Sequence, residues 1–298
     1  MDTSKPDYLA LDWKSKQDRL WAEITADNSI GGYSFPPVVL TQSMDTVFDN
    51  EWDVLPAGRV KAIHGVGSIC PFVVKIAESP YTGLFKAGET HGIIRMGSAK
   101  DFTSLLASGM IPGCSIKFLR TGKVSANIVI LNSFAPMENE NHNFFAVPMS
   151  NHLNEEIVSP FVRKFCQGTN CPERIGISDV CKYDQDGNEA SEIIFPFKVT
   201  FVPGDVSFPE EYPGSLEAFV RQFDDIATGT KLYTLKAHKD PDDAEGTVLG
   251  DVITTDKCVS SKFGDTRLFF RHQRIEEDKA LRPEWANAFD DYCNRLCK

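Results

Sequence analysis

Residues 116–131, IKFLRTGKVSANIVIL, constrain the fold more than any other stretch, because they predict a β-hairpin. The turn residues RTGK separate two apolar runs, and the second run alternates between two faces. One face would carry Val124, Ala126, Ile128 and Ile130, and the other Ser125, Asn127, Val129 and Leu131. The pattern therefore predicts antiparallel β structure in this part of the chain.

Similar runs recur along the chain and predict an α+β protein. Strands are expected at 59–66, 69–77, 92–96, 114–120, 124–131, 192–203, 231–238, 247–255 and 265–273. Helices are expected within the first 30 residues, between the third and fourth strands up to Gly109, around Pro160, over 213–229 and at the C-terminal end. Helices inserted between and after the strands suggest a closed or nearly closed antiparallel sheet.

The 298 residues contain no linker or internal repeat, so a single domain over 1–298 is expected. Within it we expect an N-terminal helical arm at 1–35, a barrel core at 50–275 and a C-terminal helix at 276–298. The 21 phenylalanines are a number that usually lines a wide interior or an apolar pocket.

The charge and hydropathy of the chain limit the classes of binding partner that we expect. The net charge of −11 disfavours binding to nucleic acid or to an anionic membrane surface. No run approaches the ~20 apolar residues of a membrane span, and the N-terminal residues lack the apolar core of a signal peptide. We therefore expect a soluble cytoplasmic protein.

Two motifs that could hold a metal are weak. The eight cysteines include no C-x-x-C pair, which disfavours a zinc site, and reduced thiols are expected. Asp184, Asp186 and Asn188 fit the first ligand positions of a calcium loop, but Glu189 and Phe195 stand where glycine and glutamate are needed. An Asp-Gly turn explains 183–192 better.

His64 is an ionisable ring in an otherwise apolar strand, followed by Gly65 and Gly67. It is either a hydrogen-bonded core histidine or the wall of a cavity, with the glycines clearing space for something flat.

The order of these segments resembles the catalase family, and more closely its small catalase-like branch, which includes the allene oxide synthases. The resemblance covers roughly 50–275. It rests on VKAIHGVG (60–67), HGIIRMGS (91–98), the hairpin, and the run from LYTLKAHKD to GDVITTDKCVSSKFGDTRLFF. It implies a catalase-like barrel that binds haem, and oxidoreductase chemistry on hydrogen peroxide or a fatty-acid hydroperoxide.

The resemblance also implies residue roles. His64 matches the distal histidine, a general acid and base, and Asn127 matches the distal asparagine that hydrogen-bonds peroxide. Arg95 matches an arginine that binds a haem propionate. Lys61 stands where a second such arginine is usual, with Arg59 two residues before it, and Phe144 and Phe145 could wall the pocket.

The proximal iron ligand departs from the family pattern. The family uses a tyrosinate in an arginine-x-x-x-tyrosine helix, whereas Tyr292 is preceded four residues earlier by Ala288. The iron could be ligated by Tyr292, by another residue or by a second chain. Cys293 is a less favoured ligand. The alternative is a catalase-fold protein that has lost haem and is a non-catalytic small-molecule-binding or interaction module. The partner of such a module would be a lipid-like ligand, and the protein could also assemble as a homo-oligomer.

Overall fold

The computed structural model describes residues 6–30, 53–55, 66–99, 111–132, 149–150, 176–204, 206, 221–271, 273 and 275–296. Its strands are β1 (Val66–Ile76), β2 (Gly88–Ala99), β3 (Ile111–Phe118), β4 (Ala126–Asn132), β5 (Met149–Ser150), β6 (Lys198–Pro203), β7 (Lys231–His238), β8 (Thr247–Thr254) and β9 (Val259–Ser260). Its helices are α1 (Pro6–Leu9), α2 (Trp13–Thr25), η1 (Gly83–Phe85), α5 (Ser178–Lys182), η3 (Gln222–Asp225), α7 (Lys262–Thr266), α8 (Ile275–Leu281), η4 (Pro283–Trp285) and α9 (Ala286–Leu296).

The strands form one antiparallel sheet that curls on itself. The order is β2-β3-β4-β5-β6-β7-β8-β1, and β1 also pairs with β2, so the pairings close into a ring. The short β9 continues the edge of β1 beyond the point where β8 ends. Barrel-like closure of this kind leaves few unpaired strand edges.

Alternation along the strands gives the sheet an apolar inner face. Cys70, Ile94, Ile116 and Ile128 are in register across β1 to β4, and all belong to the largest buried apolar cluster. Strands β6, β7 and β8 contribute to the same cluster. Residues one position away along each strand point to the outer face.

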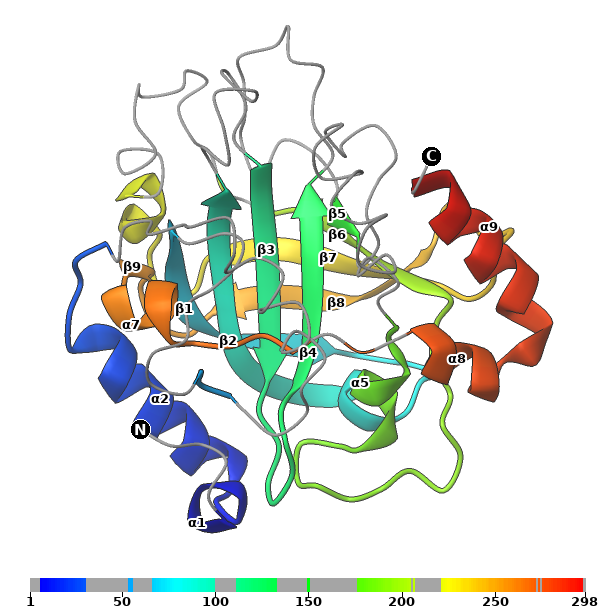
Figure 1. The fold of residues 1–298 in the computed structure, drawn as a ribbon, viewed down its shortest axis with the longest axis horizontal. Coiled ribbons are helices and arrows are strands. Elements are labelled where there is room, and N and C mark those ends of the chain that lie inside the picture. Colours follow the sequence, from blue (N-terminus) through cyan, green and yellow to red (C-terminus); the bar gives the residue numbers. More distant parts are fainter. Residues whose placement is uncertain are drawn as a thin grey trace, which may run out of the picture.

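Helix α2 and α7 lie against the outer face of β1 and β2, at one end of the longest axis, while α8 and α9 lie at the other end (Figure 1). Leu20 and Ile24 of α2 are buried against Ile69 and Ile93 in a second apolar cluster. The C-terminal α9 instead packs through Phe289, which stacks on Phe197 with ring centroids 4.7 Å apart.

Several sequence predictions are confirmed. The hairpin of β3 and β4 forms, with Ala126 and Ile128 on the inner face and Ser125 and Asn127 on the other. The predicted strands at 231–238 and 247–255 are β7 and β8, and the N-terminal helix is α2. Gly187, with φ of 83°, sits in the predicted Asp-Gly turn, which Asp184 and Asn188 close by hydrogen bonds.

Two of the predicted strands are wrong: one does not form, and the other begins later than predicted. The described residues of 265–273 form no strand beyond an isolated bridge at Leu268, because Ser261 caps α7 by accepting a hydrogen bond from the Gly264 backbone N–H. The strand expected at 192–203 begins only at Lys198, because the side chain of Phe195 turns toward Trp285.

The C-terminal helix expected at 276–298 is two helices, α8 and α9, separated by the short η4 at Pro283. Of the helix expected at 213–229, the described part is η3 followed by Gly229. The first predicted strand up to 65 and the helices expected before Gly109 and around Pro160 lie outside the described residues.

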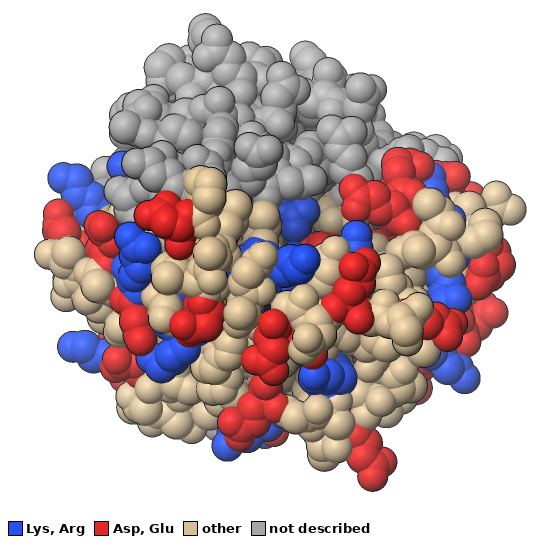
Figure 2. All heavy atoms as spheres, turned by 90° about the horizontal axis from the view of Figure 1, so that it is seen from below, with Lys and Arg blue, Asp and Glu red and all other residues tan. Residues whose placement is uncertain are grey.

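Lysines and arginines are interspersed with acidic residues over the face seen in Figure 2. Among the described residues, no helix combines the length and the apolar character needed to cross a membrane.

Candidate functional site

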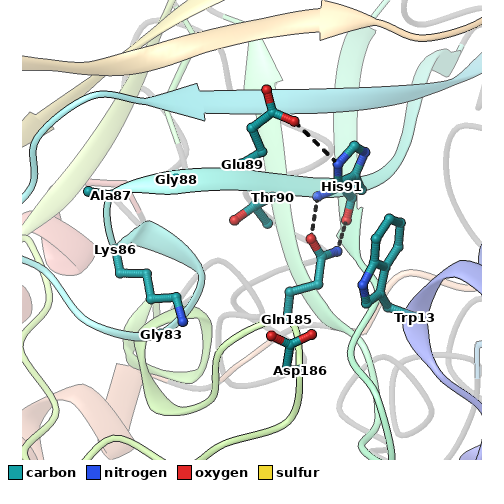
Figure 3. Close-up of a pocket in the computed structure, with 10 residues that line it drawn as sticks. All are labelled: Trp13, Gly83, Lys86, Ala87, Gly88, Glu89, Thr90, His91, Gln185 and Asp186. Atoms are coloured by element: carbon teal, nitrogen blue, oxygen red, sulfur yellow. Dashed lines mark hydrogen bonds and ion pairs between the residues drawn. The ribbon is translucent and has the colours of Figure 1, made fainter.

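A pocket of about 210 Å³ lies where α2 meets the start of β2. Trp13 stacks on His91, with ring centroids 4.6 Å apart, and the side-chain amide of Gln185 both donates to and accepts from the His91 backbone (Figure 3). Burial, the largest influence, lowers the pKa of His91, so the ring is neutral at pH 7. Lys86 is held by Asp184 at 2.7 Å. Most polar groups here are thus already engaged, and the sequence predicted no role for them.

Arg95 is on the outer face of β2 and forms an ion pair with a carboxylate of the protein, while its buried Nε has no hydrogen-bond partner among the described residues. Its Nη2 donates to Oδ1 of Asp265 in α7 at 2.8 Å, and the two side chains are only 4% and 0% exposed. The same carboxylate oxygen accepts a hydrogen bond from the Gly67 backbone N–H at 2.9 Å. Asp265 therefore joins α7 to both β1 and β2.

The absence of a side chain at Gly67 has a local explanation. A Cβ at this position would lie 2.9 Å from Cζ of Arg95 and 2.6 Å from the carbonyl oxygen of Met96. The space that the sequence suggested for a flat ligand is filled at Gly67 by the guanidinium of Arg95. Gly65, the other glycine of that prediction, is outside the described residues.

Asn127 lies on the same outer face as Arg95 and is 4% exposed. Its Nδ2 donates to the carbonyl of Ser125 at 3.3 Å, and its Oδ1 has no hydrogen-bond partner in the described structure. Leaving a buried acceptor unsatisfied costs about 1–3 kcal/mol. Such an atom is where a bound molecule with a donor could be held.

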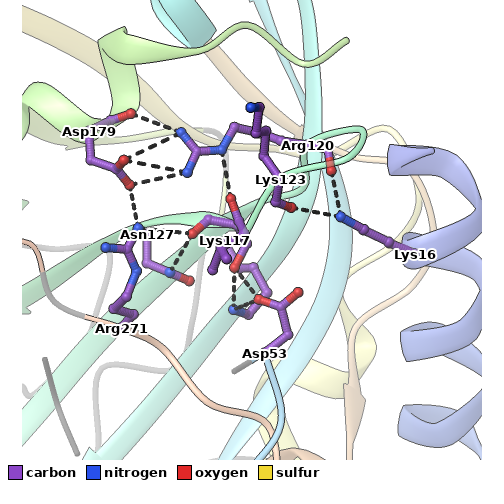
Figure 4. Close-up of polar contacts among 10 residues, drawn as sticks. Lys16, Asp53, Lys117, Arg120, Lys123, Asn127, Asp179 and Arg271 are labelled. Atoms are coloured by element: carbon purple, nitrogen blue, oxygen red, sulfur yellow. Dashed lines mark hydrogen bonds and ion pairs between the residues drawn. The ribbon is translucent and has the colours of Figure 1, made fainter. Parts of the chain in front are cut away.

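A buried polar cluster surrounds Asn127 (Figure 4). Lys117, fully buried on β3, donates to Asp53 and to Ser125, both at 2.8 Å, and Tyr8 donates to the other oxygen of Asp53 at 2.7 Å. Burial alone would raise the pKa of Asp53, but Lys117 and the hydroxyl donors lower it to about 2. Asp53 is thus a charged anchor for the outer face of β3 and β4.

The second half of this cluster centres on Asp179 of α5. Arg271 donates to its carboxylate at 2.5 Å, and Arg120 binds it at 3.3 Å. Lys16 of α2 donates to the carbonyls of Arg120 and Lys123 at 2.8 and 2.7 Å. Burial lowers the pKa of Lys16 to about 8. The described cluster is therefore rich in buried cations.

The remaining predicted site residues are not brought together by the described structure. His64, Lys61, Arg59, Phe144 and Phe145 lie outside the described residues. The backbone of Tyr292 lies in α9, and its side chain is not described. Helix α9, which carries the backbone of Tyr292, and α7, whose Asp265 pairs with Arg95, lie at opposite ends of the longest axis (Figure 1).

These contacts test whether the described residues suit haem. Asp265 already neutralises the charge of Arg95 and accepts a hydrogen bond from its Nη2, so a propionate at this position would compete with that carboxylate. In the described structure the partner of Arg95 is therefore Asp265, where the resemblance implies a haem propionate.

The sequence reasoning missed Asp265, Asp53 and Lys117. The signal for Lys117 was present, since a charged residue between apolar neighbours on a strand needs a buried partner. No comparable signal marked Asp265, which meets Arg95 across 170 residues of sequence.

Comparison with known proteins adds no family assignment. None of the protein-family models matches the chain, and no curated protein matches it either.

Proposed function

We propose that this chain is a catalase-like barrel protein that has lost haem and acts as a non-catalytic binding or interaction module. The observation that carries the proposal is the buried ion pair between Arg95 and Asp265. Arg95 is the residue whose family role would be to hold a propionate. A carboxylate supplied by α7 takes that role in the described structure, so the arginine needs no ligand to be neutralised.

The packing of the barrel favours binding at the surface over binding inside it. Phe72, Phe118, Phe201 and Tyr233 fill the inner face and are each 0% exposed. A large apolar ligand such as a fatty-acid derivative would have to displace this core, and removing packed aromatic side chains costs about 3–5 kcal/mol each. The surface instead offers the pocket at Trp13 and His91, which has room for a small polar molecule.

A haem enzyme acting on hydrogen peroxide or an organic hydroperoxide is the second candidate. It is favoured by Asn127, whose unpartnered Oδ1 is buried on the same face as Arg95. In that candidate His64 would move the proton of the peroxide and Asn127 would orient it. Haem would supply the redox chemistry, and the protein would have to release Arg95 from Asp265 to accept it.

Titration with hemin separates the two candidates. Absorption spectra would be recorded for the wild type, for Asp265→Asn, and for Asp240→Asn as a control in an exposed loop. We expect no sharp, saturable Soret band in the wild type or the control, and no turnover of peroxide beyond that of free hemin.

A stoichiometric Soret band in the wild type would overturn the proposal and support the haem enzyme. Loss of that band in Tyr292→Phe would then identify the proximal ligand. A band that appears only in Asp265→Asn supports the proposal directly, because it shows that Asp265 blocks the site. Circular dichroism of each variant keeps misfolding from being read as loss of binding.

A further inference from the structure

Two buried thiols meet where β1 passes from β8 to β9. Cys70 lies on β1, and Cys258 comes directly before β9. Both are free and 0% exposed, in the apolar core of the barrel. Neither contributes to the site around Arg95 or to the pocket at Trp13.

The strand register places the two cysteines opposite each other. In the pairing of β1 with β9, Ser68 is opposite Ser260 and Ile69 is opposite Val259. Continuing this register by one residue sets Cys70 opposite Cys258, and both side chains belong to the same buried apolar cluster. Directly opposed residues of antiparallel strands have Cα atoms about 4.5–5.5 Å apart, within the range that a disulfide spans.

Backbone hydrogen bonds hold this arrangement on both sides. Thr255 donates to the carbonyl of Pro71 at 3.0 Å, and Cys258 donates to the carbonyl of Ile226 at 3.2 Å. Between them, Asp256 and Lys257 form a short turn, and Trp21 of α2 donates to the Asp256 carboxylate at 3.2 Å. In the folded state the segment carrying Cys258 therefore lies against β1.

We propose that Cys70 and Cys258 form a redox-active thiol pair, which a small peroxide oxidises to a disulfide that ties β1 to the segment before β9. One thiol attacks the peroxide, which takes two electrons and leaves as water or an alcohol, and the thiol becomes a sulfenic acid. The second thiol then attacks that sulfur and releases water. Two thiols and one peroxide thus give one disulfide, one alcohol or water, and one further water.

The buried location of the thiol pair makes its oxidation by peroxide slow. Burial, together with the neighbouring Cys258 and Cys114, raises the pKa of Cys70, so the thiol stays protonated and unreactive in the closed barrel. Strand β9 pairs with β1 at only two positions, so few ladder hydrogen bonds have to break for it to open locally. Opening there admits a small oxidant, and reclosing brings the two sulfurs together.

The test uses a background in which Cys166, Cys171, Cys293 and Cys297 are replaced by serine, leaving the four cysteines that the structure describes as free. The reduced protein is treated with hydrogen peroxide, quenched with a maleimide under denaturing conditions, and digested for peptide mass spectrometry. We expect loss of two free thiols, a crosslinked peptide pair containing Cys70 and Cys258, and a rise in melting temperature that dithiothreitol reverses.

Two variants of this background make the result specific. Cys258→Ala should lose the crosslink and the reversible rise in melting temperature, whereas Cys114→Ala, also in the barrel core, should keep both. Oxidation that leaves separate sulfinic or sulfonic acids on Cys70 and Cys258, or that crosslinks another pair, would overturn the proposal. So would retention of all four thiols under conditions in which urea-opened protein forms the crosslink. The readouts are independent of hemin, so this result and the test of the proposed function can fail separately.

Discussion

Lys117 illustrates how a single residue controls the outer face of the barrel. Its ammonium group is fully buried and lies 2.8 Å from Asp53, which also accepts from Ser125 and Tyr8. A buried ion pair adds little net stability compared with an apolar pair, but removing one partner leaves a buried charge uncompensated. The effect of a substitution at Lys117 is therefore dominated by what remains at Asp53.

We expect Lys117→Met to lower the free energy of unfolding by about 3–5 kcal/mol, because the Asp53 carboxylate loses its cation. The matched control is Lys75→Met, since Lys75 pairs with Glu89 at 3.4 Å with both side chains more than half exposed. That change should cost less than about 1 kcal/mol. Urea unfolding at pH 7 measures both values, and equal costs in the two variants would contradict this account of Lys117.

At the scale of single residues, the sequence predicted the face of a strand on which a residue lies better than it predicted the residue's contacts. The two-face alternation predicted for 124–131 is confirmed at the described side chains, since Ala126 and Ile128 belong to the inner apolar cluster and Asn127 is on the opposite face. It could not predict that Arg95 would find Asp265, because that contact depends on α7 folding back over β1. Long-range ion pairs of this kind follow from the tertiary fold and leave no local pattern.

Among the elements, strands with strict alternation or clear turns were predicted well, and the rest followed competing local signals. The run DTRLFFRHQ at 265–273 has the apolar content of a strand. The cap at Ser261 starts a helix just before it, and Leu268 then pairs with Val54 at a single bridge. Side-chain capping thus overrode a weak β pattern.

Helix α5 has its N-terminus capped by another helix. Asp278 of α8 accepts hydrogen bonds from the backbone N–H groups of Ile177 and Ser178 at 2.8 and 3.0 Å. Burial nevertheless raises the pKa of Asp278 to about 6. The folded state therefore holds the Asp278 proton to higher pH than the unfolded chain does.

Because the folded-state pKa of Asp278 is the higher one, its contribution to the free energy of unfolding must fall as pH rises from about 4 to about 6. We expect the stability difference between the wild type and Asp278→Asn to shift against the wild type by about 2 kcal/mol between pH 4 and pH 7. Urea unfolding across this range, with Asp240→Asn as control, measures the shift. A difference that stays constant or grows in favour of the wild type would show that the capping hydrogen bonds outweigh burial.

For the whole molecule, the position of α2 decides whether the N-terminal region is an arm or part of the body. The sequence predicted a helical arm, and its amphipathic pattern could not say what the apolar stripe would contact. Leu20 and Ile24 are buried against β1 and β2, Gln17 donates to the carbonyl of Gly92, and Lys16 donates to the β3–β4 turn. These contacts make α2 a cover for the closed sheet.

We expect Leu20→Ala to lower the free energy of unfolding by about 2–5 kcal/mol, as for other leucines fully buried in a core. Leu281→Ala, at a leucine that is 42% exposed on α8, should change it by about 0.5 kcal/mol or less. Urea unfolding followed by both far-UV circular dichroism and tryptophan fluorescence tests this in a Trp52→Phe, Trp285→Phe background, in which Trp13 and Trp21 of α2 are the remaining tryptophans.

Coincident transitions with the two probes would mean that α2 unfolds together with the barrel. An early fluorescence transition, with little effect of Leu20→Ala on the main unfolding, would instead restore the picture of a detachable arm. The same result would leave Ile69, Ile93 and the backbone around Asp256 open to solvent, and Cys258 would then be easier to oxidise than the closed fold allows.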